Sequence, residues 1–195
     1  MSTGPVALFG PGGETLRAAA LALSEQGRPI GLSTLAPQPA QEFATASIAN
    51  ELWALGASHL HRVLDAADPA ATSAYLAELE DRYGPLVACF VDPGPSPEIP
   101  FDEFSPDEWL PALRQRLAAT LVVLRAAAPL IERRGGGPIL LAHHPAPTTT
   151  AGAMLHAALD ALPAALATEL TGRPLRIQAL QAGPEVGPLI LALLA

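Results

Sequence analysis

VALFGPGGETLRAAALALSEQG, residues 6–27, contains the pattern that decides the fold. Four apolar residues, 6–9, predict a short buried strand, and Gly-Pro-Gly-Gly at 10–13 predicts a tight turn. A helical pattern follows and stops at Gly27, the residue type favoured just after a helix. A strand, a glycine-rich turn and a helix in this order are typical of the first unit of an α/β domain.

The alternation of strand and helix continues along the chain. Asp68 followed by Pro69 is a typical helix start, with Asp as the N-cap and Pro in the first turn. We therefore expect a Rossmann-like, doubly wound parallel sheet of about seven strands with helices on both faces, forming one domain over residues 1–195. The other predicted strands are 30–33, 59–64, 86–91, 139–142, 175–180 and 189–194. The other predicted helices are 41–55, 68–83, 105–134 and 150–170.

The composition excludes several classes of partner. The formal net charge is −8, so the chain repels phosphate backbones and we expect no nucleic-acid partner. Cys89 is the single cysteine, and its apolar neighbours predict a buried core residue that forms no intrachain disulfide.

The start of the chain lacks a basic segment ahead of an apolar run, and no apolar run is as long as a membrane span. We expect no signal peptide, no membrane partner and a cytoplasmic protein.

Several stretches, in their order and spacing, resemble the short-chain dehydrogenase/reductase family. The resemblance runs from about Val6 to Gly183 and implies the Rossmann fold, an NAD(P) cofactor and a catalytic Asn, Ser, Tyr and Lys. The stretches that carry it are 17–27, 63–65 with 68–69, 82–86, 107–109, 157–159 with 166–170, and 176–180.

The family's glycine motif, Thr-Gly-x-x-x-Gly-x-Gly, is altered in this sequence. Gly10 keeps the first glycine, whereas Glu14 and Leu16 stand where the second and third belong. Those glycines let the backbone approach a pyrophosphate, so we expect NAD(P) binding to be weak or absent. A shifted loop can still form, and Asp65 is either an adenine cap or an ordinary loop residue. The cofactor contacts that the resemblance implies are Gly10, Gly12, Gly13, Asp65 and Gly94.

The family's catalytic side chains have no counterparts. The catalytic Asn falls at Arg116, the Ser at His144 or His143, and the Tyr-x-x-x-Lys pair at Gly152 and His156. The chain contains no Lys, and its last Tyr is Tyr83, so no local realignment restores the Tyr and Lys. We therefore expect no classical carbonyl reductase activity, because no Tyr is available to exchange the hydroxyl proton.

Histidines offer an alternative chemistry. His144 and His156 can form an acid/base site, with Asp92 nearby as a third group, or simply line a vacated pocket. Because neighbours on a strand point to opposite faces, we expect only one of His143 and His144 to enter the cleft. We expect no metal, since the spacing lacks a ligand signature. His59-x-His61 is a metal pair or, more simply, a surface pair at the end of a strand.

Two functions follow from these residues. The first is a degenerate, non-catalytic relative with a binding or oligomer-partner role. The alternative is an NAD(P)-dependent oxidoreductase-type enzyme with an altered, His-based active site. Helices near 107–134 and 150–170 are apolar and rich in Ala over more than one face, so we expect a homo-oligomer through them, or a related subunit as partner.

Overall fold

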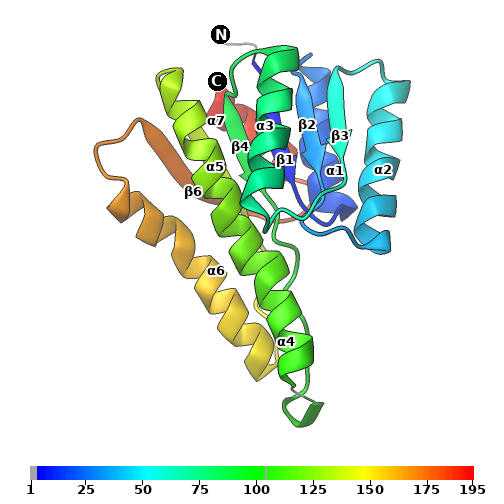
Figure 1. The fold of residues 1–195 in the computed structure, drawn as a ribbon, viewed down its shortest axis with the longest axis vertical. Helices are drawn as coiled ribbons and strands as arrows, with labels where there is room; N and C mark the ends of the chain where they lie inside the picture. The colour runs from blue at the N-terminus through cyan, green and yellow to red at the C-terminus, as the bar shows by residue number, and fades with distance from the viewer. Residues whose placement is uncertain (1–3, 104) are drawn as a thin grey trace.

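The computed structural model describes residues 4–103 and 105–195 and contains a six-stranded sheet in which every pairing is parallel (Figure 1). The strand order is β3-β2-β1-β4-β5-β6, so the direction of winding reverses between β1 and β4. This confirms the doubly wound Rossmann-like fold. The strands are β1 (Val6–Phe9), β2 (Ile30–Ser33), β3 (His59–Arg62), β4 (Ala88–Val91), β5 (Gly137–His143) and β6 (Leu175–Gln181).

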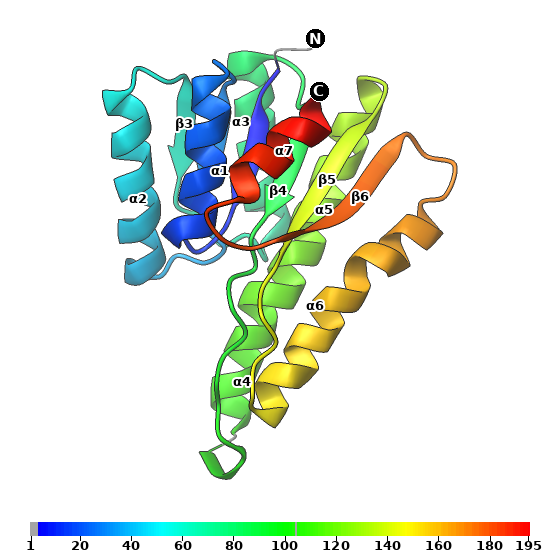
Figure 2. The same cartoon turned by 180° about the vertical axis from the view of Figure 1, so that it is seen from behind.

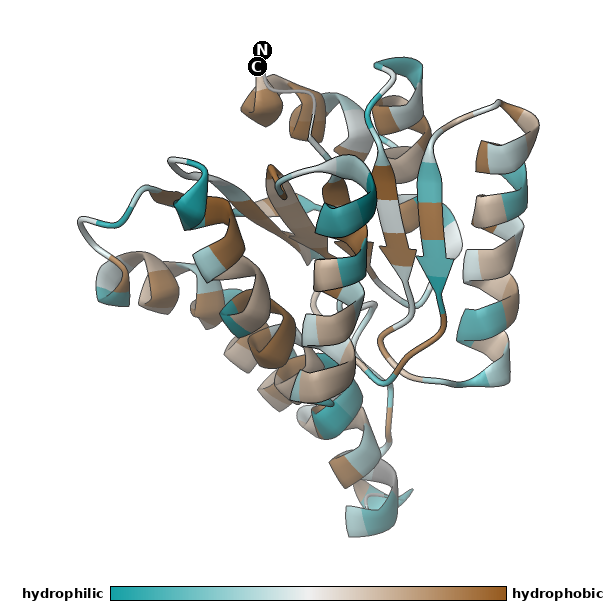
Figure 3. Cartoon of the chain, turned by 45° about the horizontal axis from the view of Figure 1, so that its top comes forward, coloured by the Kyte–Doolittle hydropathy of each residue, from teal (hydrophilic) through white to brown (hydrophobic). Residues whose placement is uncertain are grey.

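Helices cover both faces of the sheet, and each face has its own apolar core (Figure 2). The hydrophobic residues concentrate on the central strands, which are buried on both sides (Figure 3). One face carries α1 (Gly13–Glu25), α2 (Pro39–Ala54) and α7 (Val186–Leu194). The other carries α3 (Pro69–Tyr83), α5 (Ala119–Arg133) and α6 (Thr150–Glu169), whereas α4 (Pro106–Leu113), which follows a short 3-10 helix (Phe101–Glu103), extends beyond the sheet (Figure 1).

The seventh strand expected at residues 189–194 is wrong, because this segment belongs to helix α7. An apolar run of this length fits a buried strand or a buried helix equally well, and only its packing distinguishes them. Val186 and Ile190, four residues apart, are fully buried against the core beside α1. Gly187 lies so close to α1 that an added Cβ would be 2.7 Å from the Cβ of Ala22. The close approach of the two helices therefore fixes a helical conformation.

The long helix expected at 105–134 is continuous but not regular. A π-helical turn at Arg114–Ala118 separates α4 from α5. Such a turn inserts an extra residue and changes the direction in which the following side chains project. Arg114 and Arg116 both project from this turn toward the carboxyl end of the sheet, where they contact the loops after β3 and β4.

Helix α6 is the least covered of the long elements. An 18-residue window within this helix has a mean hydropathy of 1.2, and only 17% of that window is buried. By length and composition alone, α6 is the one helix among the described residues that could cross a membrane, although His156 and Asp160 interrupt its apolar sequence. Its apolar residues are eight alanines, four leucines and one methionine, so small side chains are the most frequent on its surface.

Candidate functional site

The loops after β1, β4 and β5 meet at the carboxyl end of the sheet, where the winding reverses. Open α/β sheets bind their ligands in the crevice at this point. Gly12, Gly13 and Gly94 lie in these loops and have positive φ angles. The crevice is therefore the candidate site, and its side chains are considered first.

A buried carboxylate and a histidine form its centre. Asp92 directly follows β4 and is 2% exposed, and its Oδ1 lies 2.6 Å from Nε2 of His144, which follows β5. The backbone N–H of Gly94 donates to the same oxygen at 2.8 Å. An ionised Asp92 accepts hydrogen bonds only, so Nε2 of His144 carries the proton in this pair.

Arg116 brings a third charge to this centre. Its Nη1 donates to the carbonyl oxygen of Pro93 at 2.8 Å. Burial lowers the pKa of the Arg116 guanidinium, and the Asp92 carboxylate opposes that shift. The positive charge of Arg116 thus compensates the buried negative charge of Asp92. Asp92, His144 and Arg116 are hereafter called the charge network.

A second histidine pair lies beside the charge network. Nδ1 of His143 is 3.0 Å from Oδ1 of Asp160 on α6, and the rings of His143 and His156 are 5.3 Å apart. His143, His144 and His156 all line one small cavity of about 20 Å³, with room for about one water molecule. The expectation that only one of His143 and His144 enters the cleft was wrong, because β5 ends at His143 and His144 belongs to the following loop.

Neighbouring chain fills the space beside Gly152, the residue at which the resemblance places the family's Tyr. A Cβ on Gly152 would lie 2.5 Å from the carbonyl oxygen of Pro97 and 2.9 Å from Cγ of Pro147. The loop after β4 therefore passes directly over the first turn of α6. Thr148 and Thr149, just before α6, donate to the Glu98 carboxylate, which lowers the pKa of Glu98. These contacts fix the loop in place.

Side chains of the same chain pack closely against most of the glycines expected to contact the cofactor. A Cβ on Gly10 would lie 3.1 Å from both Leu16 and Asp92, and one on Gly12 would lie 2.4 Å from the Cβ of Ala44. A Cβ on Gly94 would lie 2.9 Å from Nη1 of Arg116. Of the four expected glycine contacts, only Gly13 has no atom within 4 Å of an added Cβ.

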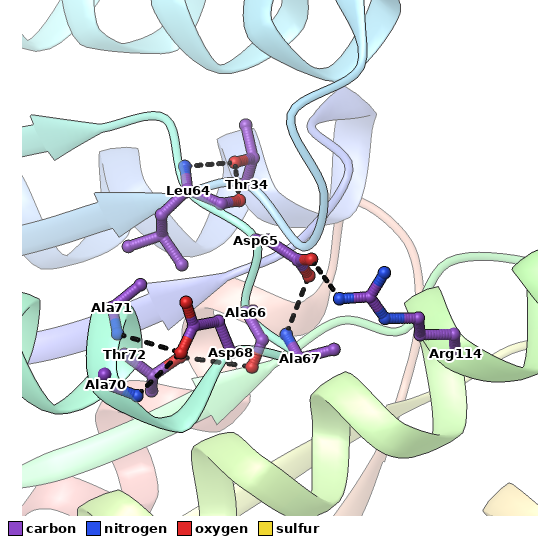
Figure 4. A network of polar contacts seen from close by, with 10 residues as sticks. All are labelled: Thr34, Leu64, Asp65, Ala66, Ala67, Asp68, Ala70, Ala71, Thr72 and Arg114. Atoms are coloured by element: carbon purple, nitrogen blue, oxygen red, sulfur yellow. Dashed lines mark hydrogen bonds and ion pairs between the residues drawn. The ribbon is translucent and has the colours of Figure 1, made fainter.

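Asp65 lies at the other end of the crevice, after β3 (Figure 4). Its Oδ1 accepts from the backbone N–H of Ala67 at 3.0 Å, and its Oδ2 accepts from Nη2 of Arg114 at 2.6 Å. Thr34 joins the ends of β2 and β3 by exchanging hydrogen bonds with the backbone of Leu64. Both carboxylate oxygens of Asp65 are thus already bonded within the chain.

The remaining candidates have separate environments. His59 contacts the carbonyl oxygen of Ala57, and His61 contacts Thr45, each at 3.0 Å. No group of three His, Cys, Asp or Glu residues is placed to hold a metal within residues 4–103 and 105–195. Cys89 is buried at the centre of the sheet, and burial raises its thiol pKa to about 12. Cys89 is therefore a core residue.

Comparison with known proteins places the chain in a family. The sequence model described as enoyl-(acyl carrier protein) reductase matches residues 17–188. The chain belongs to the short-chain dehydrogenase/reductase family. The resemblance given by the residue stretches is therefore confirmed. No curated protein matches the sequence of this chain.

Solved structures show the same family fold. A 3-ketoacyl-ACP reductase from Sinorhizobium meliloti is 26% identical, with a TM-score of 0.77 over 91% of this chain and 71% of that one. A short-chain type dehydrogenase/reductase from Mycobacterium marinum is 17% identical, with a TM-score of 0.84 over 98% and 87%. A gluconate 5-dehydrogenase from Burkholderia cenocepacia, in complex with NADP and tartrate, is 23% identical, with a TM-score of 0.75 over 93% and 71%.

The structure brings several of the predicted site residues together, and it adds two side chains that the sequence analysis did not name. Asp92 was predicted to lie near His144, and the two side chains are hydrogen-bonded, whereas the position of Arg116 beside them was not predicted. Arg114 and Asp160 were not singled out at all. The signal for Arg114 is its spacing, since it lies two residues before Arg116 in a segment with a single acidic residue, Glu132, between 114 and 134.

Proposed function

We propose that this short-chain dehydrogenase/reductase is a degenerate, non-catalytic member with a binding or oligomer-partner role. One observation carries the proposal: Arg116 and His144, which the resemblance places at the family's catalytic Asn and Ser, both belong to the charge network around the buried Asp92. The buried Asp92 links the substitutions at Arg116 and His144, because both side chains lie near its carboxylate. A buried carboxylate is costly unless paired, and the pairing is supplied by His144 at one catalytic position and Arg116 at another. The two changes, together with Asp92, therefore act as one structural replacement.

The cofactor proposal follows from the glycines. The gluconate 5-dehydrogenase relative binds NADP, so the fold accepts that dinucleotide in the family. In this chain the space beside Gly10, Gly12 and Gly94 is used by Leu16, Ala44 and Arg116. These contacts do not fit a cradle in which backbone glycines approach a pyrophosphate, and they support weak or absent NAD(P) binding.

Calorimetric titration with NADH and with NADPH tests this proposal. We expect a dissociation constant weaker than about 10 μM, or a binding free energy less favourable than about −7 kcal/mol, for both cofactors. We also expect no cofactor turnover with a panel of aldehydes and ketones. A tighter constant, or turnover that persists through purification, contradicts the proposal.

The alternative is an NAD(P)-dependent oxidoreductase-type enzyme with a His-based site. Its specific support is the Asp92–His144 pair, because a carboxylate that fixes one ring nitrogen orients the other for proton transfer. In this case cofactor turnover is lost in His144→Ala or His156→Ala. His59→Ala, on β3 at the far side of the sheet, is the matched control and retains turnover.

The oligomer proposal rests on α5 and α6. Leu121 on α5 and Met154 on α6 are exposed, and most of α6 is uncovered, whereas soluble monomers rarely expose a large apolar face. We propose a cytoplasmic homo-oligomer, or a pairing with a related subunit, through these helices. Light scattering at micromolar concentration tests the homo-oligomer, and a monomer mass of 20.1 kDa contradicts it.

A further inference from the structure

The segment that follows β4 is a proline-rich strap. It comprises residues 93–100, Pro-Gly-Pro-Ser-Pro-Glu-Ile-Pro, and belongs to no helix or strand. Four of its eight residues are prolines, which fix their own φ angle and restrict the residue before them. Gly94, with φ 72°, is its one residue without a Cβ. The strap is therefore stiff along most of its length, and its backbone turns most easily at Gly94, close to β4.

The strap forms one wall of the histidine cavity, the small cavity lined by His143, His144 and His156. Pro93, Gly94 and Ser96 line this cavity from the strap. Further along, the carbonyl oxygen of Pro97 lies over the first turn of α6, only 2.5 Å from the position of a Cβ on Gly152. The strap runs beside the connection from β5 to α6 (Figure 2). It therefore restricts access to the three histidines from this side.

One carboxylate fastens the far part of the strap. Glu98 Oε1 accepts from the backbone N–H of Thr148 at 3.0 Å. Its Oε2 accepts from the Thr148 hydroxyl at 3.1 Å and from the backbone N–H of Thr149 at 3.2 Å. The Thr149 hydroxyl also donates to the carbonyl oxygen of Pro97, at 3.5 Å. These bonds all join the strap to the two residues that precede α6, where a carboxylate is also stabilised by the helix dipole.

The two ends of the strap differ in how firmly they are held. At the β4 end, Pro93 and Gly94 are buried and bonded to Arg116 and to the buried Asp92. At the far end, Glu98 is exposed, so water competes for the hydrogen bonds of its carboxylate. The contacts of Glu98 therefore break before those of Pro93 and Gly94.

We propose that the strap is an autoinhibitory lid, which turns about Gly94 and is latched over the histidine cavity by the Glu98 carboxylate. With the latch closed, the strap lies against Gly152 and Ser96 is buried beside the cavity. With the latch open, the strap leaves the first turn of α6, and the histidine cavity becomes a cleft that a ligand can enter. The fold then switches between a closed and an open crevice through one exposed side chain.

The lid goes beyond the proposed binding role, because it determines when the crevice can receive any ligand. It depends neither on cofactor binding nor on the chemistry of the histidines. Tight NADH binding would contradict the proposed function and leave the lid unaffected, whereas a strap that never opens would contradict the lid alone.

A thiol placed on the strap tests the latch. Ser96→Cys puts a thiol at a position that is 9% exposed, while the native Cys89 is fully buried and gives little background. In this background we expect Glu98→Ala to raise the rate of labelling by a thiol reagent at least about tenfold. Glu103→Ala, which removes an exposed carboxylate from the neighbouring 3-10 helix, is the matched control and leaves the rate unchanged. Equal rates with and without Glu98→Ala overturn the latch.

A second variant displaces the strap without altering the latch. Gly152→Ala adds a Cβ that is too close to the Pro97 carbonyl oxygen for the strap to stay in place. Alanine also favours the helix more than glycine does, so we expect α6 to be retained and circular dichroism to be unchanged. Labelling of Ser96→Cys is expected to rise about tenfold here as well. A rate equal to that of Ser96→Cys alone refutes the lid.

Carbethoxylation of histidines gives a readout that needs no added thiol. The side chain of His144 is 14% exposed in the closed state. We expect diethyl pyrocarbonate to modify His144 at least about tenfold faster in Glu98→Ala and in Gly152→Ala than in wild type, as measured by peptide mass spectrometry. His59, on β3 at the far side of the sheet, is the internal control and keeps its wild-type rate. Unchanged modification of His144 in both variants, or an equal increase at His59, overturns the inference.

Discussion

Two carboxylate contacts at the carboxyl end of the sheet, the Asp65–Arg114 ion pair and the Asp92–His144 hydrogen bond, have the same length but different surroundings. Asp65 and Arg114 are 2.6 Å apart in the β1–β2–β3 half, and Asp92 and His144 are 2.6 Å apart in the β4–β5–β6 half. The side chains of the first pair are 30% and 64% exposed, and those of the second are 2% and 14% exposed. Water screens the first pair and not the second. Burial, rather than distance, therefore determines which pair the fold depends on.

The largest effect is expected at His144. His144→Ala leaves the Asp92 carboxylate buried without its closest partner and is expected to lower the free energy of unfolding by about 3 kcal/mol. Urea denaturation of wild type and variant measures the difference. In a double-mutant cycle with Asp92→Asn, the two positions are expected to couple by at least about 1 kcal/mol. Additive losses would show that the pair is not energetically linked.

The glycine turn allows a second test, in the half with the exposed ion pair. Gly12 has φ 91° and ψ −158°, a conformation that is essentially confined to glycine, and an added Cβ meets Ala44. Gly12→Ala is expected to cost about 2 kcal/mol. Gly13→Ala is the matched control, since its φ is also positive but an added Cβ meets nothing within 4 Å. Equal losses at both positions would assign the whole effect to backbone conformation and none to packing on α2.

A smaller effect is expected at the exposed ion pair. Arg114→Ala removes the ion pair with Asp65 but leaves the hydrogen bond from Ala67 to the same carboxylate. The free energy of unfolding is expected to fall by less than about 1 kcal/mol, and less still at 1 M salt. Thermal melts at low and high salt measure it. A loss as large as that of His144→Ala would remove the contrast between the two pairs.

The smallest effect concerns pH and His61. Burial lowers the pKa of His61 in the folded chain, with His59 and Arg62 adding to the shift. The unfolded chain then binds the proton more readily, so this contribution to stability is present above about pH 6.5 and is lost as the pH falls. Between pH 7 and pH 5, wild type is expected to lose slightly more stability than His61→Gln. Parallel pH profiles in denaturant titrations would count against this assignment.

The sequence predicts the fold well where one local pattern determines one structure. The turn at 10–13 and the Asp68–Pro69 helix start are local, and the structure has α1 and α3 beginning there, with Asp68 accepting from Ala70 and Ala71. Residues 189–194 were misassigned because their conformation depends on α1, which is distant in sequence. The π-helical turn was also missed, since no local pattern marks the extra residue.

The sequence predicts where the candidate site lies, but it does not predict which of its side chains bond to each other. The resemblance to the family predicts that Arg116 and His144 stand at catalytic positions, because they lie at fixed distances from the helix segments that carry the resemblance, and this assignment stays a prediction. That His144 bonds to Asp92 depends on how β4 and β5 end, which residue types do not specify. The closed position at Gly152 is also tertiary, since Pro97 comes from a loop more than 50 residues earlier.

The single thiol of Cys89 can report how often the centre of the sheet opens. Cys89 is 0% exposed and lies between Ala7 of β1 and Ile139 of β5, with a thiol pKa of about 12 in the closed state. A thiol reagent can therefore modify it only while the centre of the sheet is open. Because there is one such atom per chain, the labelling rate reports a single opening event, and each tenfold change in that rate corresponds to about 1.4 kcal/mol of opening free energy.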